Sequence, residues 1–134
     1  MKAIIDTRFL LTHFLALDEE TKKWTKTTLE TLQKEPNLGI IPSIVIHEFY
    51  KFEMQTLGID VANIRIKNIM NSNLTITDLD SAIAIEAAQL RCRYADLPTA
   101  DAIIAATSIN LSANFVLTDD KHIKQIKETK TKWI

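Results

Sequence analysis

The sequence predicts a three-layer α/β/α domain in which helices cover both faces of a central, mainly parallel sheet. Short apolar runs alternate with longer stretches of helical periodicity, and this alternation is typical of parallel strands joined by helical crossovers. At 134 residues, 46% of them hydrophobic, the chain has the length and composition to bury one compact core. We therefore expect residues 1–134 to form a single domain.

The predicted elements follow one another in a regular order. Strands are expected where apolar residues run together, and helices where they recur at helical spacing. In chain order, we expect a strand at Ala3 to Ile5, helices at Thr7 to Ala16 and Asp18 to Lys34, a strand at Leu38 to Ile41, helices at Ser43 to Leu57 and Asp60 to Asn71, a strand at Leu74 to Ile76, helices at Leu79 to Tyr94 and Thr99 to Leu111, a strand at Phe115 to Leu117, a helix at Asp119 to Lys127 and a last short strand near Trp133.

A shortage of cysteine and glycine excludes several classes of protein. Cys92 is the only cysteine, so no internal disulfide forms, and we expect a reducing compartment, the cytoplasm. The apolar residues before Asp6 are too few for a signal peptide or a membrane span. Gly39 and Gly58 are the only glycines, which excludes a phosphate-binding loop, a dinucleotide-binding turn and a serine-hydrolase elbow.

The charge balance limits how this protein meets nucleic acid. A formal net charge of -1 argues against binding by bulk electrostatics, so any contact with nucleic acid must be local. The candidate patch is a run of lysines near the C-terminus, and a solvated lysine face is an equally good interpretation of it. The lysines are Lys121, Lys124, Lys127, Lys130 and Lys132.

Acidic residues follow the predicted strands at the positions where ligands bind in open parallel sheets, beyond the carboxyl ends of the strands. Asp6 follows the first strand, Asp119 and Asp120 follow the strand that ends at Leu117, and Glu48 and Asp101 come early on helices. Two carboxylates ~4 Å apart repel each other by about 4 kcal/mol at an effective dielectric near 20. Metal ions relieve that repulsion, and oxygen ligands with few histidines favour Mg²⁺ or Mn²⁺ over zinc.

Each acid also has a purely structural interpretation. Glu48 lies within an apolar helical stripe, where it needs a cation, a hydrogen-bond partner or a proton, and pairing with Arg8 or Arg91 would supply one. Asp101, and likewise Asp6 and Asp120, are placed to stabilise a helix start. We interpret Asp78 and Asp80 as helix-start acids too, and we expect only packing roles for the histidines, which lack zinc-site spacing: His13, His47 and His122.

Taken together, these segments resemble the PIN-domain family, specifically VapC-type toxins of toxin–antitoxin pairs, over essentially the whole chain. The resemblance rests on the order of several short segments. They are Ile4-Ile5-Asp6-Thr7 with Phe9-Leu10-Leu11, then Pro42-Ser43 through His47-Glu48, then Ala100-Asp101-Ala102-Ile103-Ile104-Ala105-Ala106-Thr107, and finally Val116-Leu117-Thr118-Asp119-Asp120-Lys121-His122-Ile123.

The resemblance implies a divalent-metal-dependent endoribonuclease that hydrolyses RNA phosphodiesters. It identifies Asp6, Glu48 and Asp101 as metal-binding and catalytic acids, and it selects Asp120 over Asp119 as the last of the set. Residues expected to support the site or touch substrate are Thr7, Arg8, Thr118 and Asp119. In this scheme Mg²⁺ or Mn²⁺ activates a water that attacks the phosphorus in line.

The same resemblance implies a homodimer that binds a small VapB-like antitoxin. We expect Trp24, Leu29 and Leu32, with nearby residues of the Ser43 to Leu57 helix, to leave apolar surface for a partner. Arg8 departs from the family pattern, which often has a small polar residue there. This departure keeps open the alternative of a scaffold that binds RNA or protein without cutting. A second alternative is an RNA-processing PIN nuclease without an antitoxin, which a neighbouring antitoxin gene would argue against.

Overall fold

The computed structural model describes residues 1–133, and its centre is a five-stranded sheet of order β3-β2-β1-β4-β5. All neighbouring strands are parallel, as the register pairs Ile4 with Ile40 and Val116 show for the three central strands. The strands are β1 (Lys2–Ile5), β2 (Leu38–Pro42), β3 (Thr75–Thr77), β4 (Phe115–Leu117) and β5 (Thr131–Lys132). The predicted strands are therefore present, within one or two residues of their expected bounds.

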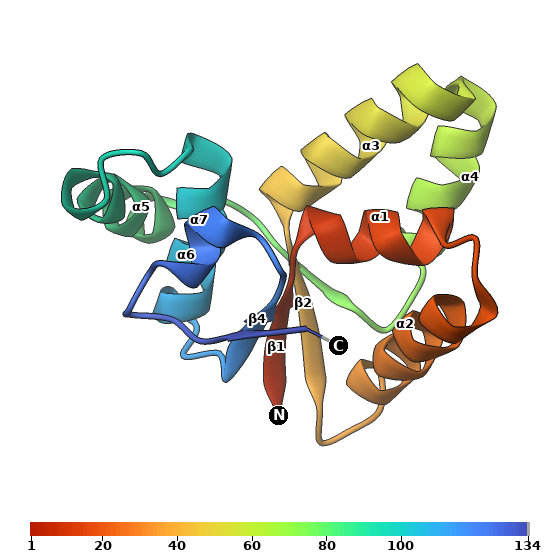
Figure 1. Cartoon of the computed structure of the whole chain (residues 1–134), viewed down its shortest axis with the longest axis horizontal. Coiled ribbons are helices and arrows are strands. Elements are labelled where there is room, and N and C mark those ends of the chain that lie inside the picture. The colour runs from red at the N-terminus through yellow and green to blue at the C-terminus, as the bar shows by residue number, and fades with distance from the viewer. Residues whose placement is uncertain (134) are drawn as a thin grey trace.

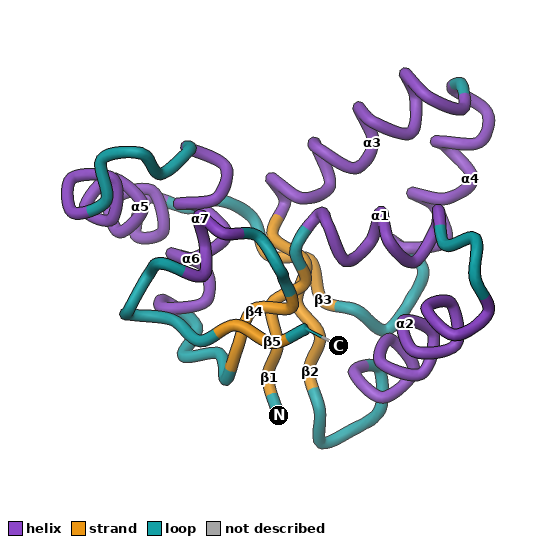
Figure 2. Tube along the Cα trace, viewed as in Figure 1, coloured by secondary structure: helices purple, strands orange, loops and turns teal. Residues whose placement is uncertain are grey.

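Helices lie on both sides of this sheet, so the predicted three-layer α/β/α architecture is confirmed. They are α1 (Thr7–Leu15), α2 (Glu19–Leu32), α3 (Ser43–Leu57), α4 (Ile59–Met70), α5 (Ser81–Arg93), α6 (Thr99–Asn110) and α7 (Lys121–Lys124). Figure 1 shows α5, α6 and α7 on one side of the strands, and α1, α2 and α4 on the other. Figure 2 shows the strands gathered between these two groups.

Two apolar clusters hold the layers together. The larger one joins the sheet to the helices that follow β1 and β2, and it includes Ile4, Phe9, Ile40 and Phe49. The second lies between α5 and α6, where Ile83, Leu90 and Ile103 pack with Ile126 from the segment after α7. Ala3, Ile4 and Ile5 of β1 are completely buried. The backbone of Asp6, which follows them, is therefore held in place by the core.

One of the two glycines allows close packing, and the other allows a turn between two helices. A Cβ atom at Gly39 in β2 would lie 2.7 Å from Leu74 Cδ2 and 3.0 Å from Leu32 Cβ, so glycine allows the end of α2 to approach the sheet. Gly58 has φ +91° and ψ 166°, a conformation open essentially to glycine alone, at the junction between α3 and α4. These two helices therefore form a hairpin.

Two expectations about the helices were wrong. The last predicted helix, Asp119 to Lys127, is reduced to α7, because Asp120 caps its start and the chain turns after Gln125 to reach β5. Leu29 and Leu32 leave no apolar surface on α2, since both are buried in the core, and Trp24 is half-buried against Phe9 and Trp133. The part of this expectation that concerned the Ser43 to Leu57 helix is confirmed, because exposed apolar side chains lie on α3 and continue onto α4. They are Phe52, Met54, Leu57, Ile59, Ile64 and Met70.

Within residues 1–133, no helix combines the length and apolar character needed to cross a bilayer.

Candidate functional site

Four acidic side chains reach the carboxyl edge of the sheet from four different elements. Asp6 follows β1 and caps α1, and Asp120 caps α7 just beyond β4. Glu48 lies in the first half of α3, which starts directly after β2, and Asp101 lies in the first turn of α6. Because the strands are parallel, these positions share one edge. We refer to Asp6, Glu48, Asp101 and Asp120 as the four acids.

Asp6 is the most deeply placed of the four acids, with 3% of its surface exposed. Its Oδ1 accepts a hydrogen bond from the Thr7 amide at 2.7 Å, and its Oδ2 accepts one from the Thr118 hydroxyl at 2.6 Å. Burial raises the pKa of Asp6 to about 7, against the effect of these hydrogen bonds, and the nearby charges of Asp101 and Glu48 add to the rise. A cation beside this carboxylate would therefore stabilise its ionised form.

Asp101 is affected by the same crowding. Its pKa is raised to about 6, first by burial and then by repulsion from Asp120 and Glu48, while His122 and Arg8 act in the opposite direction. The N-cap position of α6 is Pro98, and no side chain caps that helix. Asp101 therefore makes no capping hydrogen bond, but its place in the first turn still fits the structural interpretation that it stabilises the helix start through the helix dipole.

Glu48 is half-buried and accepts a hydrogen bond from the Thr7 hydroxyl at 2.7 Å. Neither predicted arginine partner reaches it: Arg8 Nε donates to Asp119 Oδ1 at 2.6 Å, and Arg91 Nε donates to the Leu97 carbonyl at 3.1 Å. Glu48 also lines a groove of about 420 Å³ between α3 and α6. The groove is bordered by Ile44, His47, Lys51, Phe52, Gln55, Thr99 and Ala100.

The buried glutamate with an arginine partner is a different residue. Glu53, on α3, is fully buried, and both its carboxylate oxygens accept hydrogen bonds from Arg65 of α4, at 2.9 and 2.8 Å. This pair ties the two helices of the hairpin together. This pair was not predictable from the sequence, because the partners lie on separate helices.

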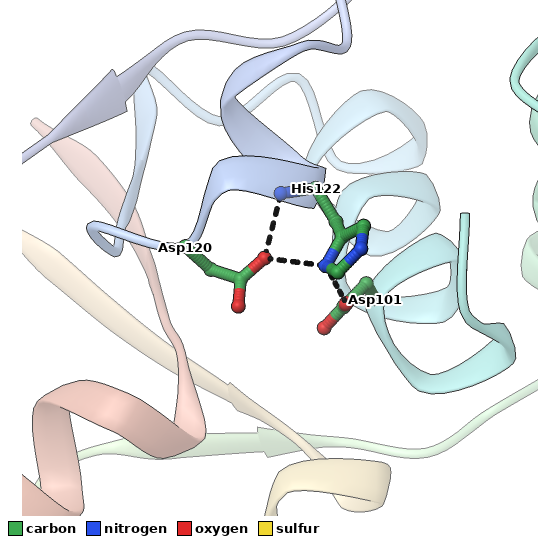
Figure 3. Close-up of side chains that lie close together, drawn as sticks. All are labelled: Asp101, Asp120 and His122. Atoms are coloured by element: carbon green, nitrogen blue, oxygen red, sulfur yellow. Dashed lines mark hydrogen bonds and ion pairs between the residues drawn. The ribbon is translucent and has the colours of Figure 1, made fainter. Parts of the chain in front are cut away.

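Asp120 and Asp101 lie on either side of His122, a residue for which we expected only a packing role. The His122 amide donates to Asp120 Oδ1 at 2.8 Å. Its ring Nδ1 lies 3.3 Å from Asp120 Oδ1 and 3.7 Å from Asp101 Oδ2, and Figure 3 shows the ring nitrogen directed at both carboxylates. One ligand atom from each of these three residues lies within 4.8 Å of the others. The signal for His122 was its spacing, two residues after Asp120 at a helix start.

The residues expected to surround the site are all at this edge. Thr7 and Thr118 hold Glu48 and Asp6 through their hydroxyls, and the Thr118 oxygen also accepts the Asp120 amide at 3.0 Å. Arg8 and Asp119 form an exposed ion pair. The hydrogen bond with Asp119 raises the pKa of the Arg8 guanidinium. Asp80, by contrast, caps α5 through the Ile83 amide, as predicted for a helix-start acid.

The donor set fits a divalent cation. Carboxylate oxygens are the preferred ligands of Mg²⁺ and Mn²⁺. Among residues 1–133, no lysine or arginine forms an ion pair with any of the four acids, and Arg8 acts on them only at longer range. His122 is the basic side chain that lies within ion-pair distance of two of them. Burial is the main cause of the raised pKa values of Asp6 and Asp101, and the neighbouring carboxylates add to it.

Comparison with known proteins identifies the family and supports the fold. The sequence matches the model of the PIN domain over residues 3–129. The fold is similar to that of a chain in the crystal structure of VapBC2 from Rickettsia felis bound to a DNA fragment from the VapBC2 promoter. The TM-score is 0.82 at 18% sequence identity, and the match covers 99% of this chain and 98% of that chain.

Two further solved structures are similar over most of their length. VapC20 of Mycobacterium tuberculosis, a Sarcin-Ricin loop cleaving toxin, gives a TM-score of 0.74 at 13% identity, with 91% of this chain and 92% of that chain covered. A toxin-antitoxin complex from Klebsiella pneumoniae gives 0.67 at 20% identity, with 98% and 95% covered. No curated protein sequence matches significantly. At these identities the structural likeness establishes the fold.

Proposed function

Because this chain belongs to the PIN domain family, we propose that it is a divalent-metal-dependent endoribonuclease and the toxin of a toxin–antitoxin pair of the VapBC kind. One observation carries the proposal: four acids from four separate elements lie at one edge of the sheet, and none is paired with a lysine or arginine among residues 1–133. A buried carboxylate without a cation is costly, so an arrangement of this kind suits a site that receives one.

Each residue has a role that follows from its contacts. Asp6, Glu48, Asp101 and Asp120 would hold Mg²⁺ or Mn²⁺, and the bound metal would lower the pKa of water and stabilise charge on the phosphodiester. Thr7 and Thr118 fix the orientation of Glu48 and Asp6 through hydrogen bonds of 2.7 and 2.6 Å. These contacts hold the carboxylates in place before substrate arrives, and such preorganisation keeps the reacting groups aligned.

Arg8 and the groove beside Glu48 supply contacts for an RNA backbone. Asp119 holds the Arg8 guanidinium at the rim of the site, where about half of the Arg8 side chain is exposed and a substrate phosphate can reach it. Lys51 and the exposed ring of Phe52 line the groove that opens beside Glu48. A cation and an aromatic surface are the two features with which proteins bind single-stranded nucleic acid. The chain therefore needs no large basic excess to bind RNA locally.

Partners are part of the same proposal. The exposed apolar side chains of the α3–α4 hairpin, among them Met54, Leu57 and Ile64, offer surface to a VapB-like antitoxin or to a second copy of the chain in a homodimer. We place this single-domain protein in the cytoplasm, where an RNA target and an antitoxin would both be available. Copurification with a short neighbouring gene product, and light scattering of the isolated chain, test these two associations separately.

Cleavage by an Asp101→Asn variant tests the enzymatic part of the proposal. Asparagine nearly preserves the shape of Asp101 but removes a negative ligand, so cleavage of RNA should be lost while circular dichroism shows a folded protein. Asp80→Asn is the matched control, because Asp80 also follows a strand and begins a helix but lies outside the four acids. Its activity should equal that of the wild type.

The chemistry can be checked with the unmodified protein. Cleavage should stop with a chelator, return with Mg²⁺ or Mn²⁺, and leave 5′-phosphate ends. A folded Asp101→Asn variant with full activity would contradict the proposed role of Asp101. Cleavage through a 2′,3′-cyclic phosphate in the presence of a chelator would contradict metal dependence itself.

A further inference from the structure

His122 occupies a position that the four acids alone do not explain. Its ring is mostly buried, with 28% of the side chain exposed, and it stands between the carboxylates of Asp120 and Asp101. The Nδ1 atom is 3.3 Å from Asp120 Oδ1 and 3.7 Å from Asp101 Oδ2 (Figure 3). A donor nitrogen therefore faces the place where an ion held by these two acids would lie.

We propose that His122 Nδ1 is a metal ligand that makes the site prefer Mn²⁺ and later transition-metal ions over Mg²⁺. The proposal rests on the proposed function, because it concerns the same site. Imidazole nitrogen binds transition metals well, whereas Mg²⁺ is bound by oxygen ligands and keeps several of its waters. Replacing one oxygen ligand by an imidazole should therefore weaken Mg²⁺ binding relative to Mn²⁺.

The distances suit a shared ion. Two ligand atoms that each lie about 2.1 Å from one metal at a right angle are about 3 Å apart. The separation of 3.3 Å between His122 Nδ1 and Asp120 Oδ1 is close to that value. The 3.7 Å between His122 Nδ1 and Asp101 Oδ2 lies between it and the separation of about 4.2 Å expected for ligand atoms on opposite sides of the ion. The His122 amide holds Asp120 Oδ1 at 2.8 Å, so the two residues are positioned by one short turn of chain.

Two other roles for His122 would produce different metal dependences. As a protonated counter-ion of Asp120 and Asp101, His122 would compete with every metal ion, and its removal would raise all affinities. As a group that only orients Asp120, it would support every metal ion equally, and its removal would lower all affinities by a similar factor. Only a direct ligand changes the ratio of Mn²⁺ affinity to Mg²⁺ affinity.

The test is a titration of the metal-free protein at pH 8, without RNA, with Mn²⁺ followed by electron paramagnetic resonance and with Mg²⁺ followed by calorimetry. His122→Ala removes the ligand. His122→Asn keeps a polar atom near the position of Nδ1 but makes it an oxygen, and it guards against a folding defect in the alanine variant. His47→Ala is the control, since His47 is an exposed histidine at the groove beside Glu48 and does not contact Asp101 or Asp120.

In both His122 variants we expect Mn²⁺ affinity to fall on the order of tenfold while Mg²⁺ affinity changes by less than about threefold. His47→Ala should leave both unchanged. Equal losses for the two ions, equal gains, or no change would each overturn the assignment. Those results, with metal binding intact in the wild type, would leave the proposed nuclease function standing. A wild-type protein that binds neither ion would overturn both proposals.

Discussion

Replacing Asp6 by asparagine should stabilise the metal-free protein at pH 8, even though Asp6 is central to the candidate site. Burial raises the Asp6 pKa from its ordinary 3.8 to about 7 in the folded chain. Between those two pH values the unfolded chain has released a proton that the folded chain still holds. The free energy of unfolding of the wild type therefore falls as pH rises through this window, and above pH 7 the full penalty applies.

The size of the effect follows from the two pKa values. A rise from 3.8 to about 7 corresponds to roughly 4 kcal/mol at pH 8, and to roughly 1 to 2 kcal/mol at pH 5, where only part of the window has been crossed. Asparagine avoids this penalty but disturbs the hydrogen bond from Thr118, at a cost of about 1 kcal/mol. The variant should therefore gain about 3 kcal/mol at pH 8 and less than about 1 kcal/mol at pH 5.

Urea unfolding in the presence of a chelator measures this difference at both pH values. Asp80→Asn provides the control, because Asp80 is an exposed helix cap and asparagine caps helices as well as aspartate. Its stability should change little, and by the same amount at both pH values. A gain for Asp6→Asn that does not depend on pH, or a loss at pH 8, would refute the reasoning that burial of this carboxylate opposes folding.

Further predictions concern the metal, the hairpin and its turn. Adding Mn²⁺ should raise the melting temperature by mass action in the wild type and much less in Asp101→Asn, which thermal shift measurements will show. Arg65→Ala should lower the free energy of unfolding in urea by about 3 to 5 kcal/mol, because it leaves the buried Glu53 carboxylate without its partner. A loss under about 1 kcal/mol would contradict this. Gly58→Ala should cost about 1 to 3 kcal/mol, because alanine is strained at φ +91°; an unchanged midpoint would argue against it.

The sequence predicted the elements best where local chemistry marks their ends. The helix α3 has the predicted bounds, since Pro42 precedes its start and Gly58 supplies the backbone conformation beyond its end. Strand β4 also has its predicted bounds. The short length of α7 was not predictable in this way, because the spacing of Ile123 and Ile126 suits a longer helix. The chain leaves the helix after Gln125 and goes on to β5, which pairs with β4.

Strand ends in the sequence indicated where the site lies in the fold, but they did not indicate how its side chains are oriented. The rule that ligands meet at the carboxyl edge of a parallel sheet placed Asp6 near Asp119 and Asp120 without coordinates, and the resemblance to PIN domains selected Asp120. It gave no information on the ring orientation of His122, which depends on the single turn of α7. Nor did it identify Glu53, because a buried charge is recognised only when its partner on another helix is known.

The order of the four acids along the chain has a practical consequence. Asp6 and Glu48 lie before the exposed connection between α5 and α6, and Asp101 and Asp120 lie after it. A chain cut within residues 94–98 would yield two fragments, each with half of the carboxylates and neither with the whole constellation. During synthesis, too, the edge stays incomplete until Asp120 has been added. Reassembly of two such fragments would then serve as a switch whose off state contains no complete site.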